Sequence, residues 1–102
     1  MSEKLVRDLI PEIITSDGET ANVRIASGDE LDVLLRAKIV EEAKEFLKSG
    51  TAEEIADILE AIGALLALRK VSWDEINRIR EEKLEKKGGF TKGYVLTMEN
   101  DT

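Results

Sequence analysis

The chain has 102 residues, with 22 acidic and 15 basic side chains, a net charge of −7, and neither histidine nor cysteine. This acidic balance argues against nucleic-acid binding, which needs a basic face, and the missing cysteines and histidines exclude disulfides, thiol chemistry and the commonest general base. No apolar run approaches the roughly 18 residues of a membrane span and no signal peptide opens the chain, so we expect a cytoplasmic protein without a membrane partner.

We expect residues 1–102 to form a single all-α domain, an antiparallel bundle of three long helices and a short N-terminal helix. The short helix falls within residues 4–15, where Pro11 suits its first turn. Its apolar side chains would anchor it: Leu5, Leu9, Ile10, Ile13 and Ile14. Brief extended pieces at residues 19–27 and 94–98 would pair as a small two-stranded ribbon.

The first long helix is predicted over residues 30–48, with Asp29 as its N-cap and Gly50 as its stop. Positions at 100° intervals give it the following apolar arc: Leu31, Leu34, Leu35, Ile39, Ala43, Phe46 and Leu47. Glu42 falls inside this arc and Glu45 falls at its edge. Two acidic side chains are therefore expected to face the core.

The second long helix is predicted over residues 52–70, with this apolar arc: Ile55, Ile58, Ala61, Ile62, Leu65 and Leu68. Glu54 lies inside the arc and Asp57 at its edge. Thr51 and Glu54 also fit a capping box, but a Glu54 side chain that binds metal cannot close the cap as well. Residues 61–68 are apolar nearly all round, which predicts self-association as a homodimer or a higher homo-oligomer.

The turn between these helices brings two pairs of carboxylates face to face, Glu42 with Glu45 and Glu54 with Asp57. Unpaired carboxylates removed from water cost several kcal/mol each, so a compensating cation is expected. All-oxygen donors suit Mg²⁺, whereas zinc would want histidine or cysteine. The simpler alternative is that these acids are solvated surface, as most helical acids are.

The last long helix is predicted over residues 73–87, with Ser72 and Glu75 in a capping box. Arg80 and Lys83 fall within its apolar arc. Either their aliphatic stems cover apolar surface while the charged ends reach solvent, or the two cations face the acids and would bind phosphate there. Gly88 and Gly89 end this helix.

Two motifs, Glu41-Glu42-Ala43-Lys44-Glu45 and Glu54-Ile55-Ala56-Asp57, resemble the pattern of the all-α nucleoside triphosphate pyrophosphohydrolase superfamily. This is the MazG-like group, which includes phosphoribosyl-ATP pyrophosphohydrolase. Residues 4–11, Arg80, Lys83 and residues 88–90 are similar to a subgroup of predicted house-cleaning phosphatases. One departure is the spacer of eight residues, 46–53, which is shorter than usual in the superfamily.

The resemblance implies a Mg²⁺ cofactor, with Mn²⁺ as a substitute, on the four acids already singled out: Glu42, Glu45, Glu54 and Asp57. It implies hydrolysis of a nucleoside triphosphate between its α- and β-phosphates by an activated water. Glu41 and Glu42 would be catalytic. The cations expected to bind the substrate are Lys38, one turn before Glu42, together with Lys4, Arg7, Arg80 and Lys83.

Two other functions stay open on the sequence. One is a helical protein-interaction module that uses the acids as a structural metal site. The other is hydrolysis of phosphoribosyl-ATP itself. The four aromatic residues give no basis for choosing a nucleobase.

Overall fold

The computed structural model describes residues 3–98 and contains, within that range, four helices and no strand. The helices are α1 (Ile10–Ser16), α2 (Gly28–Ser49), α3 (Ala52–Arg69) and α4 (Trp73–Lys87). The all-helical prediction is confirmed, whereas the small ribbon is not, because residues 19–27 and 94–98 form no strand. In the described part, no helix combines the length and the apolarity that a membrane crossing requires.

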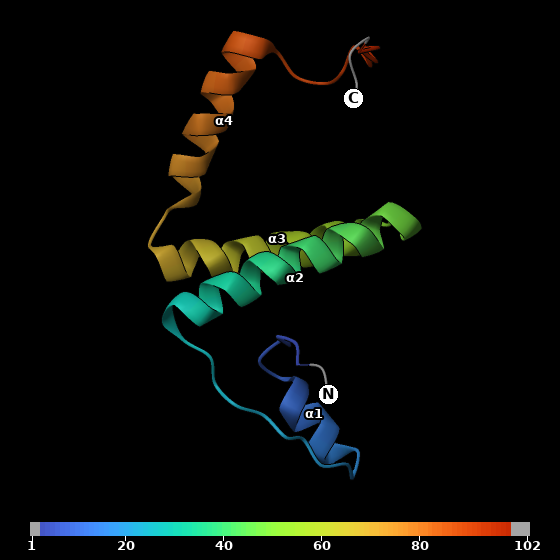
Figure 1. The fold of residues 1–102 in the computed structure, drawn as a ribbon, viewed down its shortest axis with the longest axis vertical. Coiled ribbons are helices and arrows are strands. Elements are labelled where there is room, and N and C mark those ends of the chain that lie inside the picture. The colour runs from blue at the N-terminus through green and yellow to red at the C-terminus, as the bar shows by residue number, and fades with distance from the viewer. Residues whose placement is uncertain (1–2, 99–102) are drawn as a thin grey trace. The chain divides into compact units, whose positions relative to one another are not determined.

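The chain divides into two units, Met1–Val71 and Ser72–Thr102, and α2 and α3 form the centre of the first. These two helices lie side by side and antiparallel (Figure 1). Gly50 makes the reversal: its φ of 65° is left-handed, and its N–H donates to the Phe46 carbonyl at 2.8 Å. Gly50 was therefore correctly predicted as the stop of α2.

The predicted N-cap of α2 was wrong. The helix begins at Gly28 with Ser27 as its N-cap, and Asp29 lies in the first turn. An acidic residue in the first turn complements the helix dipole without capping the helix. Residue preferences therefore do not distinguish an aspartate at the N-cap from one in the first turn. Thr51 is the N-cap of α3 but makes no side-chain cap bond, so the alternative capping box with Glu54 does not form.

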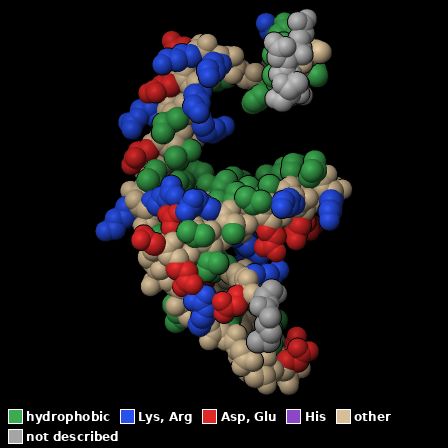
Figure 2. Space-filling view, in the orientation of Figure 1, with side chains coloured by type: hydrophobic (Ala, Val, Ile, Leu, Met, Phe, Trp, Pro, Cys, Tyr) green, Lys and Arg blue, Asp and Glu red, His purple; other side chains and the backbone are tan. Residues whose placement is uncertain are grey.

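The core of the first unit is smaller than the apolar arcs predict. Leu35 and Ala61 are its buried apolar residues, at 5% and 7% exposure. Leu9, Ile13, Leu47 and Ile55 were expected to be buried but are exposed, with Leu47 at 86%. Each helix of the pair covers only one stripe of the other. Hydrophobic side chains therefore remain exposed along one edge of the pair (Figure 2).

An ion-pair fork joins the start of α2 to the end of α3. Arg69 donates to both carboxylate oxygens of Asp32, from Nε at 2.7 Å and from Nη2 at 2.9 Å, and Arg36 donates at 3.0 Å. The hydrogen bond from Arg69 holds the pKa of Asp32 below its ordinary value of 3.8, even though desolvation opposes this shift. The fork therefore stabilises the folded state while Asp32 is ionised.

We expect Asp32→Asn to lower the melting temperature at pH 7. Because the pKa of Asp32 is lower in the folded protein than in the unfolded one, its ion pairs stabilise the fold above the unfolded pKa. This stabilisation is lost as the pH falls through the native pKa. The difference between variant and wild type should therefore shrink and vanish in strong acid, as measured by thermal melts from pH 7 to pH 2. Asp29→Asn in the first turn of the same helix is the control, and an equal loss there would attribute the effect to negative charge at the helix N-terminus and not to the ion pairs of Asp32.

The second unit is built around α4. Its capping box is confirmed, because the Glu75 N–H donates to the Ser72 hydroxyl oxygen at 3.1 Å while the Ser72 N–H reaches the Glu75 carboxylate at 3.5 Å. The helix ends at Gly88, whose φ of 80° a side chain would disfavour. Its apolar stripe remains exposed, including Trp73, Ile79 and Leu84.

Candidate metal centre

The antiparallel pair brings three acids of the predicted site together. Glu42 projects from α2, and Glu54 and Asp57, one turn apart, project from α3. One carboxylate oxygen from each lies within 4.8 Å of the others. Three oxygen donors at this spacing can hold a metal ion, as the sequence predicted.

Burial makes this cluster unusual. Glu42 is only 8% exposed, and both its Oε2 atom and the Oε2 atom of Glu54 are buried without a hydrogen-bond partner. Desolvation raises the pKa of Glu54, and the charges of Glu45, Asp57 and Glu42 raise it further. A divalent cation would satisfy the orphaned oxygens and relieve the repulsion, and the all-oxygen donor set fits Mg²⁺ or Mn²⁺.

Glu45, the fourth predicted ligand, lies outside this cluster of three and is exposed. It nevertheless lies near enough for its negative charge to raise the pKa of Glu54. Its place is at the rim of the site.

Lys38 lies beside the buried end of the cluster. Its Nζ atom is 2.9 Å from Glu41 Oε2 and 3.4 Å from Glu42 Oε1. Desolvation would lower the pKa of Lys38, but the hydrogen bond and the charge of Glu41, with those of Glu42, outweigh it and raise the value. The hydrogen bond from Lys38, followed by that from Lys4, lowers the pKa of Glu41.

Lys4 and Arg7, predicted to bind substrate, contact the acids of the site. Lys4 Nζ is 3.2 Å from Glu41 Oε1, and Arg7 Nη2 is 2.6 Å from Asp57 Oδ1. These two pairs were not predicted from the sequence. The available signal was an excess of inward-facing acids over cations on the two long helices, with two cations close together in the N-terminal segment.

A cleft of about 510 Å³ adjoins the acids. Its walls are mostly aliphatic and come from residues 5–13, from Leu35 on α2, and from Ala61 and Ala64 on α3. Charged side chains line it as well, namely Arg7, Asp8, Lys38, Glu42, Asp57 and Glu60. The arrangement offers room for an organic group whose charged end lies at the carboxylates.

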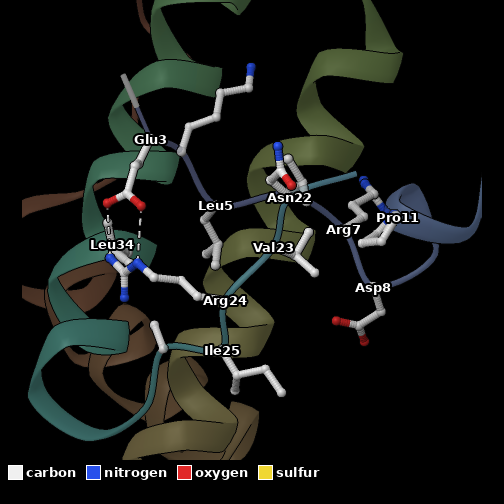
Figure 3. Close-up of a pocket in the computed structure, with 13 residues that line it drawn as sticks. Glu3, Leu5, Arg7, Asp8, Pro11, Asn22, Val23, Arg24, Ile25 and Leu34 are labelled. Carbon is white, nitrogen blue, oxygen red and sulfur yellow. Dashed lines mark hydrogen bonds and ion pairs between the residues drawn. The ribbon is translucent and has the colours of Figure 1, made fainter. Parts of the chain in front are cut away.

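A second hollow, of about 350 Å³, lies between residues 3–11 and residues 22–26 (Figure 3). Arg24 points toward Glu3 there and binds both its oxygens at 3.1 Å, and it also binds Glu30 at 2.7 and 2.9 Å. These ion pairs fix the start of the N-terminal segment to the loop before α2.

Arg80 and Lys83 lie on α4 in the second unit, and both are exposed. Arg80 donates to the Asn77 side chain at 3.0 Å. Their predicted binding to substrate stays a prediction.

Comparisons with models of known families, with curated proteins and with solved structures found no match to this chain. What the candidate site can do therefore follows from its own chemistry. It combines three clustered carboxylates, two orphaned oxygens and three neighbouring cations.

Proposed function

We propose that the chain is a Mg²⁺-dependent nucleoside triphosphate pyrophosphohydrolase that cleaves between the α- and β-phosphates, giving a nucleoside monophosphate and pyrophosphate. The observation that carries this proposal is the cluster of Glu42, Glu54 and Asp57, in which Glu42 is buried and two carboxylate oxygens lack a partner. The resemblance of residues 41–57 to the superfamily motif supports the same reaction.

The metal ion would be held by Glu42, Glu54 and Asp57, with Glu45 at the rim. When bound, it lowers the pKa of coordinated water and neutralises phosphate charge. Glu41, beside Lys38, is the carboxylate proposed to accept a proton from the attacking water. Lys38, Lys4 and Arg7 supply positive charge for phosphate oxygens, and we propose the same role for Arg80 and Lys83.

The substrate is proposed to be a noncanonical nucleoside triphosphate, removed in cytoplasmic house-cleaning. The cleft beside the acids would take the base and sugar, while the phosphates would lie toward Glu42 and Asp57.

The proposal is tested by screening standard, oxidised, deaminated and methylated triphosphates, and phosphoribosyl-ATP, with Mg²⁺. We expect pyrophosphate release from at least one of the modified nucleotides. Release from phosphoribosyl-ATP alone would replace the house-cleaning assignment. No release from any substrate at a Mg²⁺ concentration that saturates the protein would contradict the enzyme itself.

A helical interaction module with a structural metal site is the second candidate. It is favoured by the apolar side chains that unit Ser72–Thr102 leaves exposed, Phe90 and Val95 among them. This function predicts that Mg²⁺ raises the melting temperature while no nucleotide is turned over.

We also propose a homodimer or higher homo-oligomer formed through α3. Leu59 is 50% exposed and Ile55 45%, and these two lie on the stripe that continues to Ile62 and Leu66. Leu59→Glu should shift the protein from dimer toward monomer in analytical ultracentrifugation, because a charge would be buried in the interface. Glu53→Gln on the same helix should leave the mass unchanged. A monomeric wild type would contradict the proposal.

A further inference from the structure

Two acids of the candidate metal centre, Glu42 and Asp57, are each approached by a cation through a single oxygen. Lys38 approaches Glu42 through Oε1 at 3.4 Å, and the Oε2 atom of Glu42 is left without a partner. Arg7 binds Asp57 through Oδ1 at 2.6 Å. A carboxylate has two oxygens, so this mode of binding leaves one oxygen of each acid for a metal ion.

We propose that Arg7 is a positioning residue for the metal ligand Asp57. The guanidinium holds Oδ1, which fixes the carboxylate so that its second oxygen is available beside Glu42 and Glu54. Groups that hydrogen-bond a metal ligand orient it and raise the affinity of the site. This inference rests on the proposed metal-dependent function, to which it adds a role for the N-terminal segment.

The segment that carries Arg7 is fastened on both sides of it. Arg24 binds Glu3 with two hydrogen bonds, and Lys4 pairs with Glu41 on α2. On the other side, the Arg7 carbonyl accepts a hydrogen bond from the Ile10 N–H at 3.1 Å, where α1 begins. These contacts restrain the backbone at Arg7, which lowers the entropic cost of holding its guanidinium against Asp57.

The charge balance favours an Arg7 that stays in place when metal binds. Five carboxylates contribute to the site, namely Glu41, Glu42, Glu45, Glu54 and Asp57, against the three cations Lys4, Arg7 and Lys38. With all of them ionised, two negative charges are in excess, which is the charge of one divalent ion. The ion can therefore enter without expelling Arg7.

The test is a Mn²⁺ titration of the full chain, followed by the EPR signal of free Mn²⁺. We expect Arg7→Gln to bind Mn²⁺ roughly tenfold more weakly or worse, and Arg7→Lys to recover part of the loss. In the Asp57→Asn background, Arg7→Gln should cause no additional loss. Without metal, Arg7→Gln should melt close to wild type, because both partners of the pair are more than one-third exposed.

Arg36→Gln is the matched control, because it removes the same charge from an exposed arginine that binds Asp32, outside the site. It should bind Mn²⁺ nearly as tightly as wild type, and a loss equal to that of Arg7→Gln would overturn the positioning role. Equal or tighter binding by Arg7→Gln would also overturn it, tighter binding meaning that Arg7 competes with the ion. In both of these cases the metal centre itself would stand. A wild-type chain that binds no Mn²⁺ would overturn both proposals.

Discussion

Glu42→Gln will lower Mg²⁺-dependent pyrophosphate release by roughly a hundredfold or more. Loss of a residue that merely supports a metal ligand costs about 10- to 100-fold, and the loss of a ligand itself should cost at least as much. Glu42 is the most buried acid of the cluster, and its free Oε2 atom makes it the strongest candidate ligand. The measurement is initial rate against Mg²⁺ concentration, with the best substrate from the screen.

The same substitution should raise the melting temperature in the absence of metal. Glutamine has nearly the shape of glutamate but no charge, so the repulsion between Glu42 and Glu54 is removed, while Lys38 keeps its ion pair with Glu41. Glu53→Gln changes an exposed acid of α3 and should alter neither rate nor melting. Wild-type rates in Glu42→Gln would contradict the proposed role, and loss of helical circular dichroism in the variant would contradict the expected stabilisation.

Leu35→Ala will be the most damaging apolar truncation in unit Met1–Val71. A buried leucine replaced by alanine leaves a cavity and costs about 2–5 kcal/mol, and at 5% exposure Leu35 meets that condition. In a small domain this loss lowers the melting temperature by roughly 10 °C or more. Chemical denaturation monitored by circular dichroism measures the free energy of unfolding.

Leu47→Ala is the control for this prediction. It removes the same atoms from a side chain that is 86% exposed, so the expected change is within about 0.5 kcal/mol. Equal losses at Leu35 and Leu47 would mean that the stabilising core is not the one between α2 and α3.

Features set by neighbouring residues were predictable from the sequence. Pro11 in the first turn of α1, Gly50 at the end of α2 and the Ser72–Glu75 capping box each depend on residues a few positions apart. Glu42, Glu54 and Asp57 were predictable because helical periodicity places them on the inner faces of two helices joined by a short turn.

Features set by distant residues were not. Arg7 and Asp57 are 50 positions apart, and Asp32 and Arg69 are 37 apart, so no local pattern indicates either pair. The core was overpredicted for a related reason. Periodicity shows which residues share a face, but Leu47 and Ile55 are exposed, on faces that no helix in the described part of their unit covers.

Crystals of the chain grown with Mn²⁺ and measured at the manganese absorption edge would locate the ion through its anomalous scattering. We predict an anomalous peak at coordination distance, about 2 Å, from carboxylate oxygens of Glu42, Glu54 and Asp57. A map at saturating Mn²⁺ with no peak among these three side chains, or with the peak at another site, would contradict the assignment.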